Sequence, residues 1–350
     1  MASAASQPLS FPPEIFAALT PTPFLLAHLN PSNPKTPSLR ANGRKASQFR
    51  TPTINTNSLT HCSGSAVVRL GDTAVVCGVR GEILLAKDIP NAPHVELPDE
   101  EGDAISNNND DDDDDVTEIT SLNLLVPNIE LATGCSPAHL PGNPPSTLAQ
   151  SLSQRLLSLL NTTRLIRASD LRIMYRPPTT SDDDDDTPPP LQVVAYWTLY
   201  IDILMISLDG NPFDSAWGAI LSALQNTILP KAWWDPDLEI LLCSDRVSEG
   251  KKLKLRGSPV ASTFVVFEPG REKGVQEQRT WILADPDSFE EGLCRESVTV
   301  VVDYVEGVGR VRRIEKGGGV VVGRDELGYM TKLALGRWSQ WDVVLQEEME

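Results

Sequence analysis

Residues 208–217, Leu-Asp-Gly-Asn-Pro-Phe-Asp-Ser-Ala-Trp, mark the point at which a long apolar segment turns into a helix. The apolar segment covers 191–208 and predicts a long strand, and Gly210 predicts a tight turn after it. Beyond the turn, apolar residues recur at helical spacing: Trp217, Ile220, Leu221 and Leu224. This pattern predicts a helix that packs one face against the core.

The net charge of the 350-residue chain is −18, and two aspartate tracts carry much of it. Asp110–Asp115 and Asp182–Asp186 together hold eleven aspartates. Runs of like charge repel one another and stay solvated, so the tracts predict disordered acidic insertions near 99–116 and 179–190. An acidic patch that binds a metal or a protein is the alternative, although a metal site needs fixed geometry and mixed spacing.

The cysteines and the N-terminus indicate the compartment. The five cysteines are scattered and form no C-x-x-C motif, which argues against zinc and disulfides and favours a reducing compartment. The first basic residue is Lys35, so the sequence predicts neither a secretory signal nor a transit peptide. No apolar run approaches the ~18 residues that span a bilayer. We therefore expect a soluble intracellular protein with no bound cofactor or metal and no membrane partner.

The order of patterns along the chain predicts an α+β fold. Residues 1–34 are expected to form a partly disordered N-terminal arm, and 35–345 a single domain. In its first half we expect a hairpin over 65–79, a strand over 120–126 and a helix over 147–160. In its second half we expect strands over 238–243, 262–267, 280–284, 298–303 and 308–314, a further strand after Gly317–Gly319, and a C-terminal helix. Strand groups alternate with helices twice, which predicts two βαβ-type halves.

Basic residues gather in three clusters, which is notable in an acidic chain. They are Arg40, Arg44, Lys45 and Arg50; Lys251, Lys252, Lys254 and Arg256; and Arg310, Arg312, Arg313 and Lys316. Each cluster favours either local contact with nucleic-acid phosphates or ordinary solvated surface charge. Asp202 and Asp209 are open to two interpretations in the same way, as general acid or base carboxylates or as structural residues of the strand and its turn.

Five segments together resemble one enzyme family. They are Ser38–Arg44, Gly64–Val79, a central stretch with Asp209–Asn211, Leu221–Leu224, Asn226 and Leu229–Pro230, then Ser258–Phe264, and Leu283–Pro286 with Glu290 and Glu291. These segments resemble the RNase PH family over about residues 35–345, which implies an RNase PH-like fold of the ribosomal protein S5 domain 2-like class. Within the family, Gln48–Asn55 and Val265–Phe267 resemble one type of ring subunit of the eukaryotic RNA exosome.

The resemblance implies a non-catalytic structural subunit of a hetero-hexameric exosome ring. Such a ring joins other RNase PH-like subunits, carries S1/KH cap subunits and threads RNA through its channel to a separate nuclease. The implied process is 3′-to-5′ RNA processing and degradation, including rRNA maturation and mRNA turnover, in the nucleus, nucleolus and cytoplasm. Two alternatives are a phosphate-dependent 3′-to-5′ exoribonuclease and a stand-alone RNA-binding module.

The strand-to-helix corner is where active members of the family hold inorganic phosphate. In this chain the corner carries Pro212, which has no backbone N–H, and Asp214, whose charge repels an anion. Asp285 and Asp287 remain near the family's acidic positions but would have no phosphate to assist. We therefore expect no catalytic residue. The candidates for RNA contact are Arg40, Arg44, Arg50 and Arg155.

Overall fold

A six-stranded sheet forms the first half of the molecule. The computed structural model describes residues 12–90, 109–137, 139–140, 142–178, 189–269, 280–305 and 307–347. The strands of this sheet are β1 (Pro52–Thr56), β2 (Gly64–Leu70), β3 (Thr73–Leu85), β4 (Leu125–Leu131), β5 (Arg172–Tyr175) and β6 (Gln192–Ser207). Their order is β1-β2-β3-β6-β4, with β5 also paired to β6. Only the β4–β6 pair among these is parallel.

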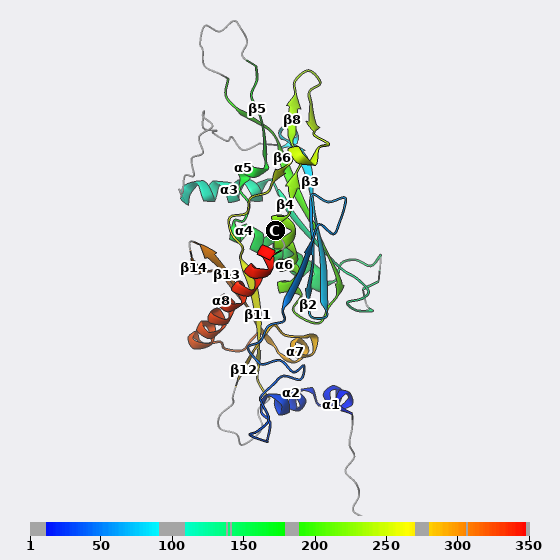
Figure 1. The fold of residues 1–350 in the computed structure, drawn as a ribbon, viewed down its shortest axis with the longest axis vertical. Helices are drawn as coiled ribbons and strands as arrows, with labels where there is room; N and C mark the ends of the chain where they lie inside the picture. Colours follow the sequence, from blue (N-terminus) through cyan, green and yellow to red (C-terminus); the bar gives the residue numbers. More distant parts are fainter. Residues whose placement is uncertain are drawn as a thin grey trace, which may run out of the picture.

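A second, antiparallel sheet of four strands follows in the second half (Figure 1). Its strands, in the order β12-β11-β13-β14, are β12 (Trp281–Ala284), β11 (Val260–Phe267), β13 (Glu296–Val305) and β14 (Val308–Gly317). Two short ladders lie between the sheets in sequence. They are β7 (Ile228–Leu229) with β10 (Lys251–Lys252), and β8 (Ala232–Asp235) with β9 (Ile240–Cys243).

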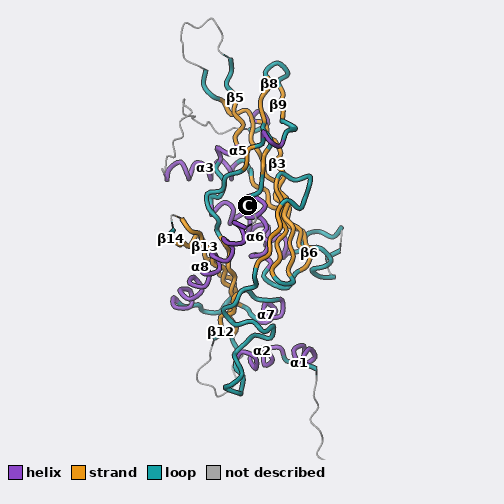
Figure 2. Tube along the Cα trace, in the orientation of Figure 1, coloured by secondary structure: helices purple, strands orange, loops and turns teal. Residues whose placement is uncertain are grey.

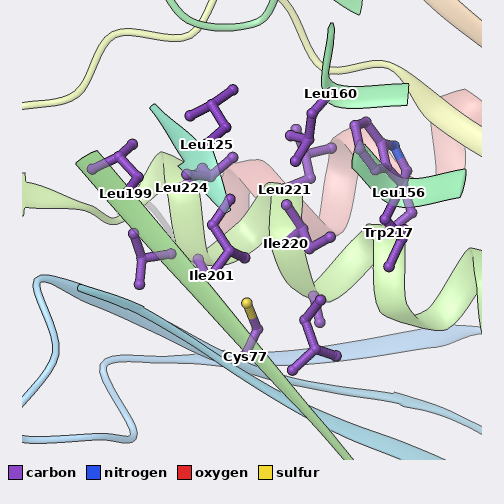
Figure 3. Close-up of a cluster of buried hydrophobic side chains, with 14 of the residues drawn as sticks. Cys77, Leu125, Leu156, Leu160, Leu199, Ile201, Trp217, Ile220, Leu221 and Leu224 are labelled. Carbon is purple, nitrogen blue, oxygen red and sulfur yellow. The ribbon is translucent and has the colours of Figure 1, made fainter. Parts of the chain in front are cut away.

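Helix α6 (Pro212–Gln225) lies between the two sheets and is buried on every side. All residues from Phe213 to Leu224 are buried, which corrects the expectation of a single packed face. The reason is that the second sheet and helix α8 (Arg324–Glu347) cover the side that would otherwise meet solvent. Figure 3 shows Trp217, Ile220, Leu221 and Leu224 among Cys77 and Ile201 of the first sheet.

Further helices lie around this core (Figure 2). They are α3 (Asn109–Ser121), α4 (Thr147–Thr163), α5 (Ala168–Leu171) and α7 (Ser288–Leu293), with single 3₁₀ turns at Ala86–Asp88 and Val247–Glu249. Helix α4 begins where the Ser146 side chain caps the Ala149 N–H. Helix α8 buries Met330, Ala334 and Trp341 against the second sheet and α6.

The described part of the N-terminal arm packs on the second sheet. It forms α1 (Pro13–Leu19) and α2 (Pro21–Leu29), each with a proline in the first turn, where a missing N–H breaks no helical bond. Leu25 and Leu29 are buried with Val265, Phe267 and Leu283.

Most of the expected elements are confirmed. The hairpin is β2–β3, the long strand is β6, the helix over 147–160 is α4, and the strand pair over 298–314 is β13–β14. Two expectations are wrong at their boundaries. Residues 120–121 end α3, so the next strand starts only at Leu125, and residues 320–323 form no strand. There the Val320 N–H donates to the Glu296 carboxylate instead of to a neighbouring strand.

The first aspartate tract also differs from the expected disorder. Residues 109–116 belong to α3, because acidic residues at a helix start are favoured by the positive end of the helix dipole. Asp115 also pairs with Arg256 at 2.5 Å. Residues 99–108 and the second tract, Asp182–Asp186, lie outside the described residues.

Candidate functional site

The strand-to-helix corner has an unusual backbone that only certain residues accept. Gly210 has φ +69°, and Asn211 follows in the left-handed conformation with φ +52°. A Cβ on Gly210 would lie 2.4 Å from the backbone carbon of Asp287, so a side chain cannot fit there. Asn211 caps α6, and Pro212 occupies the first helical position. The corner is therefore fixed against a second corner, formed by residues 284–288.

Asp285 is the centre of the second corner and is bound by cations. Its carboxylate accepts bonds from the Arg50 Nε at 2.9 Å, the Arg50 Nη2 at 2.8 Å and the Arg50 backbone N–H at 2.8 Å. Asn211 Nδ2 donates at 2.7 Å and Arg44 Nη1 at 3.3 Å. Asp285 is 1% exposed, yet the bonds and charge of Arg50 outweigh burial and lower its pKa.

Arg50 joins the two corners. Besides Asp285, its guanidinium donates to the carbonyl oxygen of Asp209 at 2.7 Å and, at 3.4 Å each, to those of Gly210 and Pro286. Its side chain is 8% exposed. A planar, always-charged guanidinium suits this position because it can donate to several acceptors in a fixed geometry.

Asp214 stands in the first turn of α6 and is 5% exposed. It accepts bonds from the Thr263 N–H at 2.8 Å, the Thr263 hydroxyl at 2.7 Å and Asn211 Nδ2 at 2.8 Å. Burial raises the pKa of Asp214, and the charge of Asp285 acts in the same direction. Thus Asp214 points into the protein and ties α6 to β11.

Glu291 binds one of the backbone donors at the helix start. Its carboxylate accepts the Asn211 backbone N–H at 2.7 Å, and burial raises its pKa to about 7. The Asp214 N–H is turned toward the Asn211 side chain at 3.4 Å, and Pro212 has no N–H at all. The start of α6 is thus capped by the chain's own groups and bordered by three carboxylates, which disfavours an anion.

Arg40 binds the helix that follows the second corner. Helix α7 begins with a capping box in which Asp287 caps Glu290 and Glu290 caps Asp287. Arg40 Nη1 pairs with Glu290 at 2.9 Å, and its other donors reach the carbonyl oxygens of Ala46, Gln48, Ala284 and Asp285. Asn42 donates to Asp287 at 2.6 Å. Side chains of the first basic cluster therefore hold residues 284–291 in place.

The structure separates the four candidates for RNA contact. Arg40 and Arg50 are 1% and 9% exposed and bond to groups of the chain itself, and their contact with RNA stays a prediction. Arg44 is 14% exposed in its side chain and bonded to Asp285. Arg155 lies apart on α4, 30% exposed, with Glu315 at 2.7 Å and the Phe213 ring at 4.2 Å. The pairing of Arg40, Arg44 and Arg50 with acids over 200 residues away has no local signal in the sequence.

The two carboxylates that could act as general acid or base, Asp202 and Asp209, both have partners within the chain. Asp202 is 46% exposed in its side chain and pairs with Arg80 at 3.2 Å. Asp209 accepts a bond from the Ser288 N–H at 3.3 Å, as a turn residue does. Within the described ranges, no group of three or more potential ligands could hold a metal, and no helix is long and apolar enough to cross a membrane.

Comparison with known proteins identifies the family. Residues 48–230 match the model for domain 1 of the 3′ exoribonuclease (RNase PH) family. The chain belongs to the RNase PH family, as expected from its motifs.

Among curated relatives, the chain is 32% identical over 310 residues to the exosome complex component rrp43 of Schizosaccharomyces pombe, covering 89% of this chain and 90% of that protein. The similarity confirms the subunit type indicated by Gln48–Asn55 and Val265–Phe267, the ribosomal RNA-processing protein 43 type. The chain is also 23% identical over 308 residues to the exosome complex component Rrp42 of Thermococcus gammatolerans, and this match covers 88% of this chain and 89% of that protein.

Solved structures confirm the RNase PH-like fold. The Archaeoglobus fulgidus exosome with RNA bound to the active site matches with a TM-score of 0.61 and 20% identity, covering 96% of this chain and 100% of that one. An archaeal exosome core matches with a TM-score of 0.58 and 19% identity, covering 97% and 100%.

Proposed function

We propose that this chain is a non-catalytic structural subunit of the RNA exosome core ring. In that role it supports 3′-to-5′ RNA processing and degradation, including rRNA maturation and mRNA turnover. The similarity to an exosome component of fission yeast over nine-tenths of both chains supports the assembly. The absence of catalysis is supported by the strand-to-helix corner, where groups of the chain itself cap the start of α6.

The observation that carries the proposal is the filled start of α6. Phosphorolysis requires a phosphate held in line with the RNA linkage, and most of its catalysis is positioning and charge stabilisation. Here Glu291 takes the Asn211 N–H, Pro212 offers none, and Asp285 takes the guanidinium of Arg50. An incoming phosphate would meet carboxylates in place of donors.

The proposed partners are other RNase PH-like subunits in a hetero-hexameric ring, S1/KH cap subunits, a separate nuclease and RNA in the channel. The outer edge of the second sheet supports assembly, because edge strand β14 exposes Val308, Val311 and Ile314 by 45–59%. Exposed apolar edge strands are normally covered by a partner. The proposed location is the nucleus and nucleolus, and also the cytoplasm.

The test combines an activity assay with an assembly assay. The purified chain, incubated with RNA and inorganic phosphate, is expected to release no nucleoside diphosphate, while a phosphorolytic RNase PH enzyme serves as the positive control. On size exclusion, the chain should co-elute with the other ring subunits. Phosphate-dependent release would instead establish the exoribonuclease alternative, and a monomer that binds RNA alone would establish the RNA-binding module.

A further inference from the structure

The second basic cluster forms a continuous track on the surface of the protein. Residues 251–256, Lys-Lys-Leu-Lys-Leu-Arg, alternate basic and apolar residues. Leu253 is 5% exposed and Leu255 packs against the main core, so the apolar side chains point inward. Because neighbouring side chains of an extended segment point to opposite sides, exposed Lys252 and Lys254 lie on the outer side, about 6.6 Å apart along the chain. The Arg256 side chain follows and is 21% exposed.

The track is held in place at both ends and in its middle. Lys251 and Lys252 pair with Leu229 and Ile228 in the β7–β10 ladder, and the Leu253 N–H donates to Thr227 O at 2.9 Å. The Arg256 N–H donates to Leu165 O at 2.9 Å, and Lys251 Nζ reaches Asp170 at 2.8 Å.

These last two contacts bring residues 165–170 alongside the segment in the opposite direction. Arg167, which is exposed, lies within this neighbouring stretch. We call Arg167, Lys252, Lys254 and Arg256 the basic track.

An exposed aromatic side chain stands close in the chain to this track. Hairpin β8–β9 begins after only Pro230 and Lys231 beyond the β7–β10 ladder, and its Trp233 is 41% exposed. Proteins that bind single-stranded nucleic acid usually combine a positively charged surface with exposed aromatic rings, and the hairpin of Trp233 follows directly on the ladder that carries Lys251 and Lys252. The ring favours RNA over an acidic polypeptide, because bases stack on aromatic faces.

One member of the track already holds an internal carboxylate. Arg256 Nη2 lies 2.5 Å from Asp115, which is the last residue of the first aspartate tract and part of α3. Lys252 and Lys254 are exposed. The carboxylate thus occupies the place on Arg256 that a phosphate oxygen would take.

We propose that the basic track binds the phosphates of single-stranded RNA and that Asp115 competes with RNA for Arg256. The inference rests on the proposed function and adds to it a surface outside the strand-to-helix corner. Contact with phosphates alone gives binding without sequence preference, which suits a subunit that handles many RNAs.

The experiment measures binding of a fluorescent single-stranded RNA to the full chain by anisotropy over a series of salt concentrations. Lys252→Glu with Lys254→Glu should weaken binding at least tenfold and reduce the salt slope by about 1.4, since each phosphate contact on a single strand contributes about 0.7. The matched control is Lys35→Glu with Lys332→Glu, which changes the charge equally at exposed sites outside the track and should leave most of the affinity. Asp115→Asn should tighten binding severalfold.

Thermal melting and co-elution with ring subunits accompany each variant, so that RNA binding is judged only on folded protein. Equal losses in the track and control variants would overturn the inference and leave the proposed function standing. So would displacement of RNA by poly-glutamate at equal charge, or a track variant that binds RNA normally but no longer assembles. Cross-linking of thiouridine RNA to the peptide containing residues 251–256 in the assembled ring would support it.

Discussion

At the scale of single residues, the strand-to-helix corner is a structural joint held by a buried ion pair. Asp285 and Arg50 are separated by 235 residues and form a buried pair with three bonds between them. A buried charge left without its partner is strongly destabilising, whereas an exposed pair contributes little. Loss of this buried ion pair is therefore expected to lower stability more than loss of an exposed ion pair in the same protein.

We predict that Asp285→Asn lowers the free energy of unfolding by about 3–5 kcal/mol, because Arg50 would keep a buried and poorly compensated charge. The control is Asp202→Asn, which breaks the exposed pair with Arg80 and should cost under ~1 kcal/mol. Urea denaturation of both variants measures the difference. Equal, small losses would mean that the Arg50–Asp285 pair does not join the corners.

A second prediction concerns Glu291 and the pH dependence of the free energy of unfolding. Its pKa is raised from 4.5 to about 7 by burial, so the folded protein holds a proton that the unfolded chain releases. The free energy of unfolding must then fall as pH rises from about 4.5 to 7, and the penalty is complete above pH 7.

Glu291→Gln keeps an acceptor for the Asn211 N–H but carries no charge. We expect this variant to be more stable than the native chain by about 1–2 kcal/mol at pH 8, with the gain disappearing toward pH 5. Asp285 stays ionised throughout, since its pKa is lowered. Melting temperatures at both pH values test this; a gain independent of pH would contradict the assignment to Glu291.

At the scale of elements, local pattern predicts what local forces determine. The β2–β3 hairpin follows from alternating apolar residues and the turn at Gly71, whose φ is +60°. The complete burial of α6 does not follow, because its second partner is a sheet that starts at Val260, far along the chain. The sequence pattern also fails to predict the ion pair of Arg50 and Asp285, because these two residues are far apart along the chain.

Two glycines in helices give a matched test of helix packing. At Gly218 of α6 a Cβ would lie 2.2 Å from the Trp341 ring of α8, while at Gly336 of α8 nothing lies within 4 Å. We expect Gly218→Ala to destabilise by about 1–3 kcal/mol through overpacking, and Gly336→Ala to stabilise by up to ~1 kcal/mol through helix propensity. Denaturation curves of the two variants measure these changes. A gain in stability at both positions would mean that α6 and α8 are not in contact at Gly218.

At the scale of the whole molecule, the two sheets share one helix and cannot be separated. The family model ends at residue 230, yet the core around α6 includes Val260, Ala261, Val301 and Trp341. Removal of the second half would expose one whole side of α6, a helix in which every residue from Phe213 to Leu224 is buried. Sequence comparison alone would suggest a domain boundary that packing does not support.

We therefore predict that residues 35–345 unfold as one cooperative unit. Calorimetry of the full chain should give a single transition in which the calorimetric and van't Hoff enthalpies agree. A fragment that ends at residue 230 should be insoluble or lack a cooperative transition, because the apolar surface of α6 loses its cover. Two separate transitions, or a fragment 1–230 that melts cooperatively by itself, would show instead that the first sheet and α6 form an independent domain, with the second sheet only docked onto it.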